Sequence, residues 1–285
     1  MSHVGSQLQT VPRAQCWCGA NVFTPFNNDY KVCAACSTLL SKELPDRSLL
    51  LGNDGSLYSK DYWLEYQTNI LHQATVFERA RTDLSERCLY WLRTVLKFKC
   101  PPGRVLEIGC AHGGFLGMLK EIGFEVKGVE LSQFVIDLAQ KTFGIEVIRG
   151  PLEPSQIEAG SLDLVVLLDV LEHLPDPSTV IDDLAKLLKP NGVLLIQTPQ
   201  WRPGKTYSEM RLTEDPLLHQ LMPLEHLVLF NENSIVSFFN GHGFRHIVFE
   251  PAIFSIYDMF LVASRQDIAV ADNTTVVAVL DRPGS

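Results

Sequence analysis

Two hydrophobic periods alternate along the middle of the chain. Short apolar runs of strand length occupy residues 104–110, 125–131, 145–150, 162–170 and 192–198. Between these runs, apolar residues three and four positions apart predict helices over 113–123, 132–144 and 176–192. The run 162–170 is apolar almost throughout, as expected for a central parallel strand covered on both faces. Strands that alternate with helices in this way predict an α/β fold with a doubly wound sheet.

The pattern changes after the last of these strands. Residues 199–230 have weak periodicity and several prolines. A long irregular stretch in a compact domain is usually a lid or a binding loop. A helix is then predicted over 231–244, and two strands over 245–250 and 255–265 are close enough in sequence to form a hairpin. With this hairpin the predicted sheet has seven strands and is mostly parallel.

The ends of the chain differ from its middle. Residues 1–45 are loop-rich and cysteine-bearing, and residues 46–100 have helical spacing. The predicted organisation is a small Cys-rich module (1–45), a helical lead-in or lid (46–100) and an α/β domain (101–265) that carries the insert 199–230. The tail 266–285 contains one more apolar run, TTVVAVL, to which the pattern assigns no place.

A glycine-bearing turn follows the first strand of the α/β domain, in the stretch RVLEIGCAHGGF. Ligands of such sheets bind at the carboxyl ends of the strands. The turn, with Gly109, Cys110, Ala111 and Gly113, brings a helix N-terminus to that edge. The second strand ends at Glu130, where a carboxylate accepts hydrogen bonds from two ribose hydroxyls. The turn and the acid together predict a site for a cofactor that contains a nucleoside.

Two classes of cofactor use this arrangement. A dinucleotide site needs glycines spaced G-x-G-x-x-G, and this turn has Ala111 at the middle position. Glu107 lies in the strand just before the turn, where a negative charge repels a pyrophosphate and attracts an ammonium group. This acid favours S-adenosylmethionine, whose amino-acid end and sulfonium are cationic. A tight strand–helix turn without any ligand is the structural alternative.

Three stretches resemble class I S-adenosylmethionine-dependent methyltransferases, namely VLEIGCAHGGFLGMLKEIGFEVKGVELS, LDLVVLLDVLEHLPDP and LLKPNGVLLIQTP. The resemblance runs from about residue 104 to residue 265. It implies a Rossmann-like methyltransferase fold, in which the closing hairpin supplies the antiparallel last strand. It also implies that the glycine turn holds the methionine end of the cofactor, and that Glu130 and the adjoining Leu131 hold the ribose.

The resemblance assigns roles to further positions. The loop after the third strand, GPLE, would hold the adenine through Leu152 and Glu153, because Pro151 stands where many relatives have an acid. Tyr58 and Tyr62, in the lead-in stretch LYSKDYWLEY, would close over the cofactor, with aromatic core packing as the alternative. The alanine in the glycine turn is expected to cost only the clearance of a methyl group.

Four residues are candidates for the acceptor side of the site. Asp169 ends the fourth strand and is expected to face the cofactor or the substrate. His173 lies near the transferable methyl in this interpretation, or else it is a helix-start histidine bonded to backbone. In the resembling family a Glu-His pair, here Glu225 and His226, lies at the acceptor pocket. We expect His226 to be the general base, because the ordinary pKa of imidazole suits neutral pH, and Glu225 to orient it or bind an acceptor hydroxyl.

Four of the seven cysteines follow the spacing C-x-C-x14-C-x2-C, namely Cys16, Cys18, Cys33 and Cys36. Thiolates grouped in this way predict a closed, tetrahedral structural zinc site, although C-x-C is tighter than the usual C-x-x-C. Four reduced cysteines without a metal are the alternative. The arrangement resembles a methyltransferase subgroup with an N-terminal zinc-ribbon-like module, which includes C-methyltransferases that act on nucleotide-linked sugars.

Composition narrows the list of partners. The net charge is −9 and no Lys/Arg cluster stands out, whereas a nucleic-acid-binding protein usually has a basic face. No stretch approaches the ~20 apolar residues that span a bilayer, and residues 1–15 contain no apolar segment typical of a signal peptide. We therefore expect a cytoplasmic protein with a small-molecule partner. The sequence leaves the oligomeric state open.

The sequence thus predicts an enzyme that transfers a methyl group from S-adenosylmethionine to a small polar acceptor, such as a sugar or a secondary metabolite. It does not separate carbon, oxygen and nitrogen acceptors. Three alternatives stay open: a nucleotide-dependent dehydrogenase, a protein or RNA methyltransferase that docks through the zinc module, and a catalytically silent module that binds the cofactor.

Overall fold

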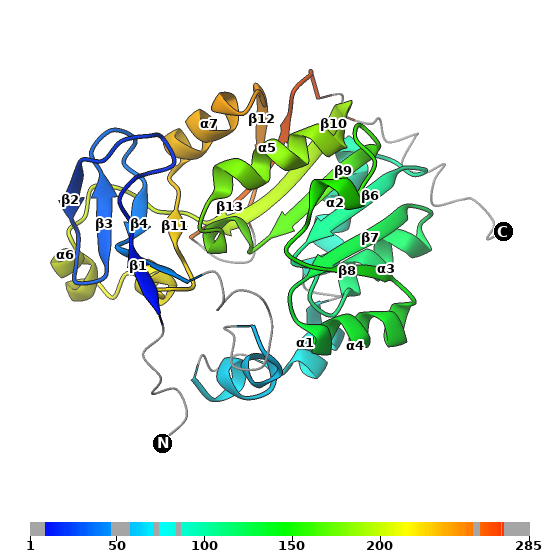
Figure 1. Cartoon of the computed structure of the whole chain (residues 1–285), viewed down its shortest axis with the longest axis horizontal. Coiled ribbons are helices and arrows are strands. Elements are labelled where there is room, and N and C mark those ends of the chain that lie inside the picture. The colour runs from blue at the N-terminus through cyan, green and yellow to red at the C-terminus, as the bar shows by residue number, and fades with distance from the viewer. Residues whose placement is uncertain are drawn as a thin grey trace.

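One seven-stranded sheet forms the centre of the molecule (Figure 1). The computed structural model describes residues 9–46, 58–70, 74–83, 87–252, 257–268 and 270. The strand order is β12-β13-β10-β9-β6-β7-β8. The strands span Arg104–Ile108 (β6), Glu125–Glu130 (β7), Glu146–Arg149 (β8), Leu162–Leu168 (β9), Leu188–Pro199 (β10), His246–Glu250 (β12) and Asp258–Ser264 (β13). Among the described strands of this sheet, β13 alone runs opposite to the others, between β10 and β12, so the predicted mostly parallel α/β fold with a closing hairpin is confirmed.

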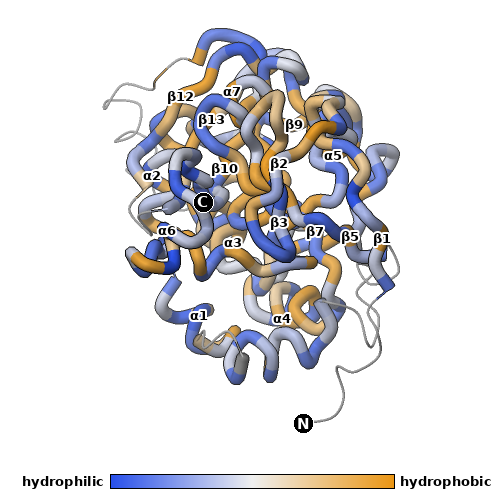
Figure 2. The backbone as a smooth tube through the Cα atoms, turned by 90° about the vertical axis from the view of Figure 1, so that its left-hand side faces the viewer, coloured by the Kyte–Doolittle hydropathy of each residue, from blue (hydrophilic) through white to orange (hydrophobic). Residues whose placement is uncertain are grey.

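Both faces of the sheet are covered, because successive residues of a strand point to opposite sides. In β9, Leu164 and Val166 pack in one core with helices α2 and α3, whereas Val165 and Leu167 pack in a second core with α5 and α7. The helices of the domain span Leu89–Phe98 (α2), Gly114–Glu121 (α3), Gln133–Phe143 (α4), Pro177–Leu187 (α5) and Glu232–Gly241 (α7). Figure 2 shows hydrophobic stretches along the inner strands and hydrophilic ones on outer segments such as α1.

Local sequence signals set several helix ends. The carboxylate of Asp176 accepts a hydrogen bond from the backbone N–H of Thr179 at the start of α5. Gly144 follows the last residue of α4 and has φ +59°, a left-handed backbone conformation that glycine adopts without the strain of a side chain. Ser132 is the N-cap residue of α4, but its side chain makes no capping hydrogen bond. These signals place the strand ends next to helix starts along one edge of the sheet.

The N-terminal module is made of short strands rather than loops alone. They span Thr10–Pro12 (β1), Phe23–Pro25 (β2), Tyr30–Cys33 (β3), Leu39–Ser41 (β4) and Glu43–Pro45 (β5). Strand β1 pairs with β5. The other three belong to a four-stranded sheet whose order is β11-β4-β3-β2. Its edge strand β11, Val228–Leu229, comes from the insert, so a single sheet joins residues almost 200 positions apart.

The insert 199–230 is more regular than the sequence indicated. It contains α6 (Tyr207–Leu212), a 3₁₀ turn η6 (Pro216–Gln220) and β11. Its buried Trp201, Met210 and Leu217 pack with Tyr30 and Leu39 of the N-terminal module. The module and the insert thus share one small core, and Figure 1 shows the two segments together beside the large sheet.

The lead-in is only partly an α-helix. Residues Tyr62–Ile70 are π-helical (η2), and α1 spans Val76–Asp83 before α2. None of the described helices is long and apolar enough to cross a membrane. The apolar run 274–280 in the tail lies outside the described residues.

Candidate functional site

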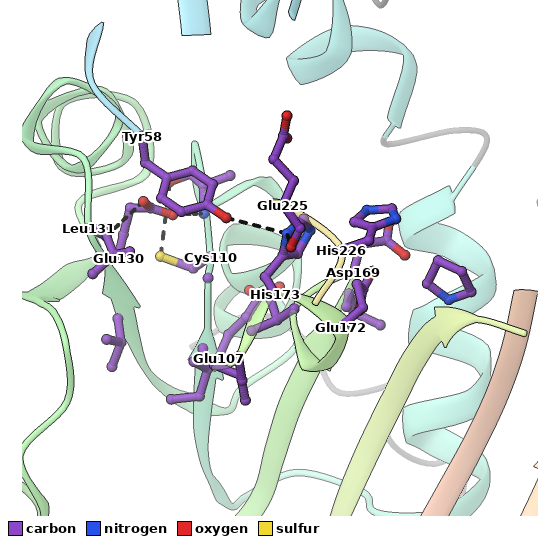
Figure 3. A pocket seen from close by; sticks show the side chains of 18 of the residues that line it. Tyr58, Glu107, Cys110, Glu130, Leu131, Asp169, Glu172, His173, Glu225 and His226 are labelled. Carbon is purple, nitrogen blue, oxygen red and sulfur yellow. Dashed lines mark hydrogen bonds between the residues drawn. The ribbon is translucent and has the colours of Figure 1, made fainter. Parts of the chain in front are cut away.

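A cavity of about 1600 Å³ opens at the carboxyl ends of β6, β7 and β9. Cavities for one drug-sized ligand have roughly 300–1000 Å³, so this one has room for two molecules side by side. Its walls contain nearly all the predicted site residues: Tyr58, Tyr62, Glu107, Gly109, Cys110, Ala111, Glu130, Leu131, Leu152, Asp169, His173, Glu225 and His226. In Figure 3, Cys110 of the glycine turn lies with Glu130 on one side, and His173 and His226 lie toward the other.

The glycine turn is held tightly against the sheet. The backbone N–H groups of Gly109 and Cys110 both donate to the Val129 carbonyl, at 2.8 and 3.1 Å. Gly109 has φ +70°, and a Cβ there would lie 2.6 Å from Cγ2 of Val170. Only glycine fits this close passage, which exposes backbone toward the cavity.

Ala111 destabilises the turn by more than the clearance of its methyl group, which was the only cost expected from the sequence. Its φ is +46°, in the left-handed region where L-residues other than glycine pay roughly 1–2 kcal/mol. Its N–H donates to a carboxylate oxygen of Glu130 at 3.1 Å, which offsets part of this strain. The expectation for Ala111 is thus corrected, because the strain is in the backbone.

Two predicted cofactor residues do not line the cavity. Gly113 is buried at the start of α3 with φ +76°, and a Cβ there would lie 3.0 Å from that of Ala139. It shapes the turn without forming the cavity wall. Glu153 is exposed, and its backbone N–H donates to Oε1 of Gln156 at 2.9 Å. The structure therefore does not bring Glu153 to the cavity, while Leu152 and Pro151 reach it.

Glu130 is a buried carboxylate already engaged with backbone. It accepts hydrogen bonds from the N–H groups of Ala111, Leu131 and Ser132, at 3.1, 2.7 and 2.9 Å. A carboxylate has about four acceptor positions, so one is left for a ligand. Burial raises the pKa of Glu130, and the three backbone donors oppose that shift.

Glu107 lies beneath the turn in β6. Only 5% of its surface is exposed, and its Oε2 has no hydrogen-bond partner among the described residues. Burial, and secondly the charge of Glu130, raise the pKa of Glu107 well above its usual value. A buried acid with an unsatisfied oxygen at the cavity wall is suited to a cationic or hydrogen-bond-donating ligand group. Cys110 also lines the cavity, and its side chain lies beside Glu130 (Figure 3).

Asp169 is held by residues that the sequence interpretation missed. Arg87 donates to its Oδ2 at 2.7 Å, and the amide of Gln197 donates to its Oδ1 at 2.9 Å. The indole N–H of Trp91 in turn donates to Gln197 at 2.9 Å. Arg87 and the acid Asp258 both line the cavity, and burial raises the pKa of Asp258 to about 7. No local motif marks these residues, because they reach the site only through tertiary packing.

The acceptor side contains two interlocked histidines. Nδ1 of His173 lies 2.8 Å from the Glu225 carbonyl, and Nδ1 of His226 lies 2.9 Å from the Gln220 carbonyl. The ring centroids are 4.8 Å apart, with the planes inclined by 71°. Burial is the main cause that lowers the pKa of His173 to about 4 and of His226 to about 3. Both rings are therefore neutral at pH 7.

Acids and tyrosines surround the histidine pair. The Tyr62 hydroxyl donates to Oε2 of Glu225 at 3.3 Å, and burial raises the pKa of Glu225. The Tyr58 hydroxyl lies 3.3 Å from Nδ1 of His173. Glu172, which the sequence interpretation passed over inside DVLEHL, is fully buried beside both rings. The two lead-in tyrosines thus contact acceptor-side residues.

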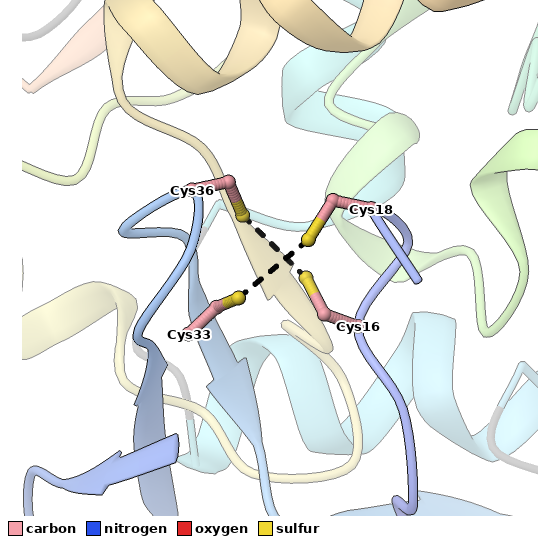
Figure 4. Close-up of side chains that lie close together, drawn as sticks. All are labelled: Cys16, Cys18, Cys33 and Cys36. Carbon is pink, nitrogen blue, oxygen red and sulfur yellow. Dashed lines mark hydrogen bonds between the residues drawn. The ribbon is translucent and has the colours of Figure 1, made fainter. Parts of the chain in front are cut away.

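The four cysteines of the N-terminal module converge (Figure 4). Sγ of Cys16 lies 3.6 Å from that of Cys36, and Sγ of Cys18 lies 3.6 Å from that of Cys33. All four sulfurs lie within 4.8 Å of one another. These distances are far longer than a disulfide bond of about 2.05 Å. The tight C-x-C spacing therefore does not keep the first two cysteines out of the cluster.

The cysteine module is tied to the acceptor side of the cavity. The buried hydroxyl of Tyr30 donates to the His226 carbonyl at 2.9 Å. The Leu227 carbonyl accepts from the Ser41 N–H at 3.1 Å and from the Arg13 guanidinium at 3.3 Å. The chain that carries Glu225 and His226 is thus fixed by the module, a link that no sequence motif indicated.

Comparisons with known proteins place the central region in a family. A family model described as "Methyltransferase domain" matches residues 78–248. A ubiquinone biosynthesis O-methyltransferase from Burkholderia vietnamiensis is 37% identical over 101 residues, and one from Coxiella burnetii is 33% identical over 99 residues. Each match covers 33% of this chain, and 44% and 42% of those relatives. The matched segment thus spans less than half of each relative.

Solved structures support the same fold. A Haemonchus contortus phosphoethanolamine N-methyltransferase 2 superposes with a TM-score of 0.55 at 18% identity, covering 80% of this chain and 63% of that one. A putative Haloferax volcanii methyltransferase in complex with the activator Trm112 gives 0.51 at 13%, covering 67% and 95%. At such identities the likeness shows the fold alone. The resemblance to sugar C-methyltransferases, the absence of a nucleic-acid partner and the cytoplasmic location stay predictions.

Proposed function

Because the chain belongs to the methyltransferase-domain family, we propose that it transfers a methyl group from S-adenosylmethionine to a small polar acceptor. The observation that carries this proposal is the large cavity, with two buried carboxylates beside the glycine turn and two neutral histidines opposite them. Its volume allows a cofactor and an acceptor to bind next to each other. The ubiquinone biosynthesis O-methyltransferases among its relatives, by their name, favour a small molecule as the acceptor.

The glycine-turn side of the cavity is the proposed cofactor subsite. Glu107 would hold the cationic amino-acid end through its unpartnered oxygen, and Glu130 would accept one hydrogen bond from the ribose. Leu131 and Leu152 provide apolar surface for the adenine. When bound, S-adenosylmethionine supplies an electrophilic methyl group on a positive sulfonium. The chain's contribution is to orient the acceptor against it and to exclude water.

The histidine side is the proposed acceptor subsite. His226 keeps its Nδ1 proton on the Gln220 carbonyl, so its Nε2 lone pair is available. We assign His226 as the general base that takes the proton of the acceptor, because its ring is neutral and Nε2 is free. Burial lowers its pKa to about 3, below the ordinary value on which the expectation rested, so it contributes less than the ~10²–10⁴-fold in rate of a base matched to neutral pH. Glu225 would bind an acceptor hydroxyl, since Tyr62 fixes its carboxylate. Tyr58 and His173 would close this side of the cavity.

The cysteine cluster is a proposed zinc site. A tetrahedral zinc with Zn–S bonds of about 2.3 Å requires sulfur atoms roughly 3.8 Å apart, and the two shortest separations here are 3.6 Å. Four sulfurs leave no open coordination position, so the ion would be structural. Cys16, Cys18, Cys33 and Cys36 would hold it, and through β4 and Tyr30 it would stabilise the segment that carries His226.

The test combines binding with turnover. Calorimetry with S-adenosylhomocysteine and with a nicotinamide dinucleotide separates the methyltransferase from a dehydrogenase; we expect only the first ligand to bind. Transfer of a labelled methyl group from S-adenosylmethionine is then measured on hydroxylated and keto small molecules, on total RNA and on protein lysate. Label on small molecules supports the proposal. Label on RNA or protein alone would favour the macromolecular alternative, and binding without transfer to any of the three would favour the silent module.

A further inference from the structure

We propose that Glu172, His173 and His226 bind one divalent transition-metal ion on the acceptor side of the cavity, apart from the cysteine cluster. One ligand atom from each of the three residues lies within 4.8 Å of those of the other two. All three residues line the cavity, so an ion among them would be in reach of an acceptor. A carboxylate and two imidazoles that converge in this way form the facial set of ligands typical of such ions.

The backbone around the two histidines prepares them as ligands. Each Nδ1 lies within 2.9 Å of a carbonyl oxygen, of Glu225 for His173 and of Gln220 for His226. A carbonyl only accepts hydrogen bonds, so both Nδ1 atoms carry the ring proton and both Nε2 atoms keep a lone pair. Metal-bound histidines almost always donate their other N–H to a carbonyl or a carboxylate in this manner.

The carboxylate of Glu172 indicates that the cluster binds a ligand. Its side chain is 0% exposed. Oε2 accepts a hydrogen bond from the Thr198 hydroxyl at 2.9 Å, whereas Oε1 has no partner among the described residues. A buried carboxylate oxygen without a partner is costly. A cation beside it would satisfy that oxygen, and the Thr198 bond would orient the carboxylate as ligating carboxylates usually are oriented.

The ligand types select the kind of ion. Imidazole nitrogens with one carboxylate suit Mn²⁺, Fe²⁺, Co²⁺ or Zn²⁺, whereas Mg²⁺ and Ca²⁺ prefer oxygen ligands alone. Three protein ligands leave coordination positions open, unlike the four thiolates of the cysteine cluster. The acceptor class that fits is therefore a molecule whose reacting oxygen can bind a metal ion.

The inference rests on the proposed methyl transfer and changes what His226 does in it. With the ion bound, the Nε2 lone pair of His226 would belong to the metal, so Glu225, which lines the same cavity, would take the proton of the acceptor hydroxyl. The ion would lower the pKa of that hydroxyl. The acceptor oxygen forms its bond to the methyl carbon as the carbon–sulfur bond breaks, and the electron pair of that bond goes to sulfur.

The experiment is a calorimetric titration of the full chain with MnCl₂. The protein is first loaded with one zinc, which thiolates prefer, and saturated with S-adenosylhomocysteine, so that Mn²⁺ reports on the N/O site. We expect one Mn²⁺ per chain. Glu172→Gln, which keeps the shape and the bond to Thr198, and His173→Ala should each weaken Mn²⁺ binding by about 100-fold or more. His219→Ala is the matched control, because this exposed histidine lines the same cavity outside the cluster, and its affinity should equal that of the unchanged chain.

Two results from the unchanged chain and the cluster variants would overturn the metal site. One is an absence of Mn²⁺ binding to the unchanged chain, and the other is unchanged Mn²⁺ affinity in both cluster variants. Loss of affinity in His219→Ala equal to that in Glu172→Gln would also contradict the assignment. S-adenosylhomocysteine binding, measured in the same samples, tests the proposed function separately. If the cofactor product binds and Mn²⁺ does not, the metal site fails while the methyltransferase proposal stands, with His226 as its base.

Discussion

Replacing Tyr30 by phenylalanine tests whether the cysteine module positions the acceptor side of the cavity. The ring of Tyr30 is fully buried and packs with Leu39, Trp201 and Leu229, so phenylalanine keeps the packing. Only the hydroxyl is lost, and with it the 2.9 Å hydrogen bond to the His226 carbonyl. The substitution therefore removes one defined contact between the module and the chain that carries the histidine.

The size of the effect follows from that contact. A buried carbonyl that loses its donor costs about 1–3 kcal/mol, which corresponds to a fall in Tm of roughly 2–10 °C for a chain of this size. The chain next to His226 would also shift, and a misplacement of about 1 Å at a reacting group can cost ~10²-fold in rate. We expect kcat to fall by about 10- to 100-fold. Tyr30 does not line the cavity, so the affinity for S-adenosylhomocysteine should stay within about twofold.

Three measurements on the same samples check this: thermal melting, calorimetry with S-adenosylhomocysteine, and methyl-transfer kinetics. Tyr207→Phe is the matched control, because the same atom is removed from a half-buried tyrosine in the insert that packs on Phe26. It should leave all three readouts near those of the unchanged chain. If Tyr30→Phe melts at a lower temperature but retains full kcat, the module only stabilises the fold and the positioning argument is refuted. An equal loss of cofactor affinity would also refute it.

Four further predictions concern other parts of the molecule. Glu130→Ala removes the one acceptor position left for a ribose and should weaken S-adenosylhomocysteine binding by about 10- to 150-fold; unchanged affinity by calorimetry would remove the ribose assignment. His226→Ala should lower kcat while sparing S-adenosylhomocysteine affinity, and loss of both would mean that the histidine is structural. Asp258 has a pKa of about 7 in the fold against 3.8 in the unfolded chain, so its stabilising contribution is present below pH 4 and is lost as the pH rises to 7. The free energy of unfolding of Asp258→Asn, measured relative to that of the unchanged chain, should therefore be higher at pH 8 than at pH 4 by up to about 4 kcal/mol in denaturant titrations. Equal changes of this free energy with pH in the two proteins would contradict the prediction. Removing zinc with a chelator should lower the Tm, and Cys33→Ser should melt early and lose that response; an unshifted melt of the unchanged chain would count against the zinc site.

The α/β domain was predictable because its signals are local. The apolar run of β9 and the helical spacing of α5 each follow from a few neighbouring residues, and their order alone implies a doubly wound sheet. The cofactor side of the cavity was predictable for the same reason. Gly109, Glu107 and Glu130 lie in or directly after strands, and parallel strands bring their carboxyl ends to one edge.

The acceptor side was predictable only in part. His173 and the pair Glu225 and His226 were found as motifs, but the sequence gives no sign that their rings and carboxylates meet. Glu172 was missed inside DVLEHL, because its role depends on full burial beside both imidazoles. The insert was expected to be an irregular lid, since a strand as short as β11 has no periodicity to detect.

The sequence by itself determined the strands and helices of the central domain, the glycine turn with its acids, and the cysteine spacing. Each depends on residues close together in the chain, where propensity and periodicity act. The tertiary structure alone decided that β11 completes the sheet of the cysteine module, that Tyr30 fixes the His226 carbonyl, and that Arg87 holds Asp169. These contacts join segments between 82 and 196 positions apart, and their free energy comes from packing and burial that exist only once the whole chain has folded.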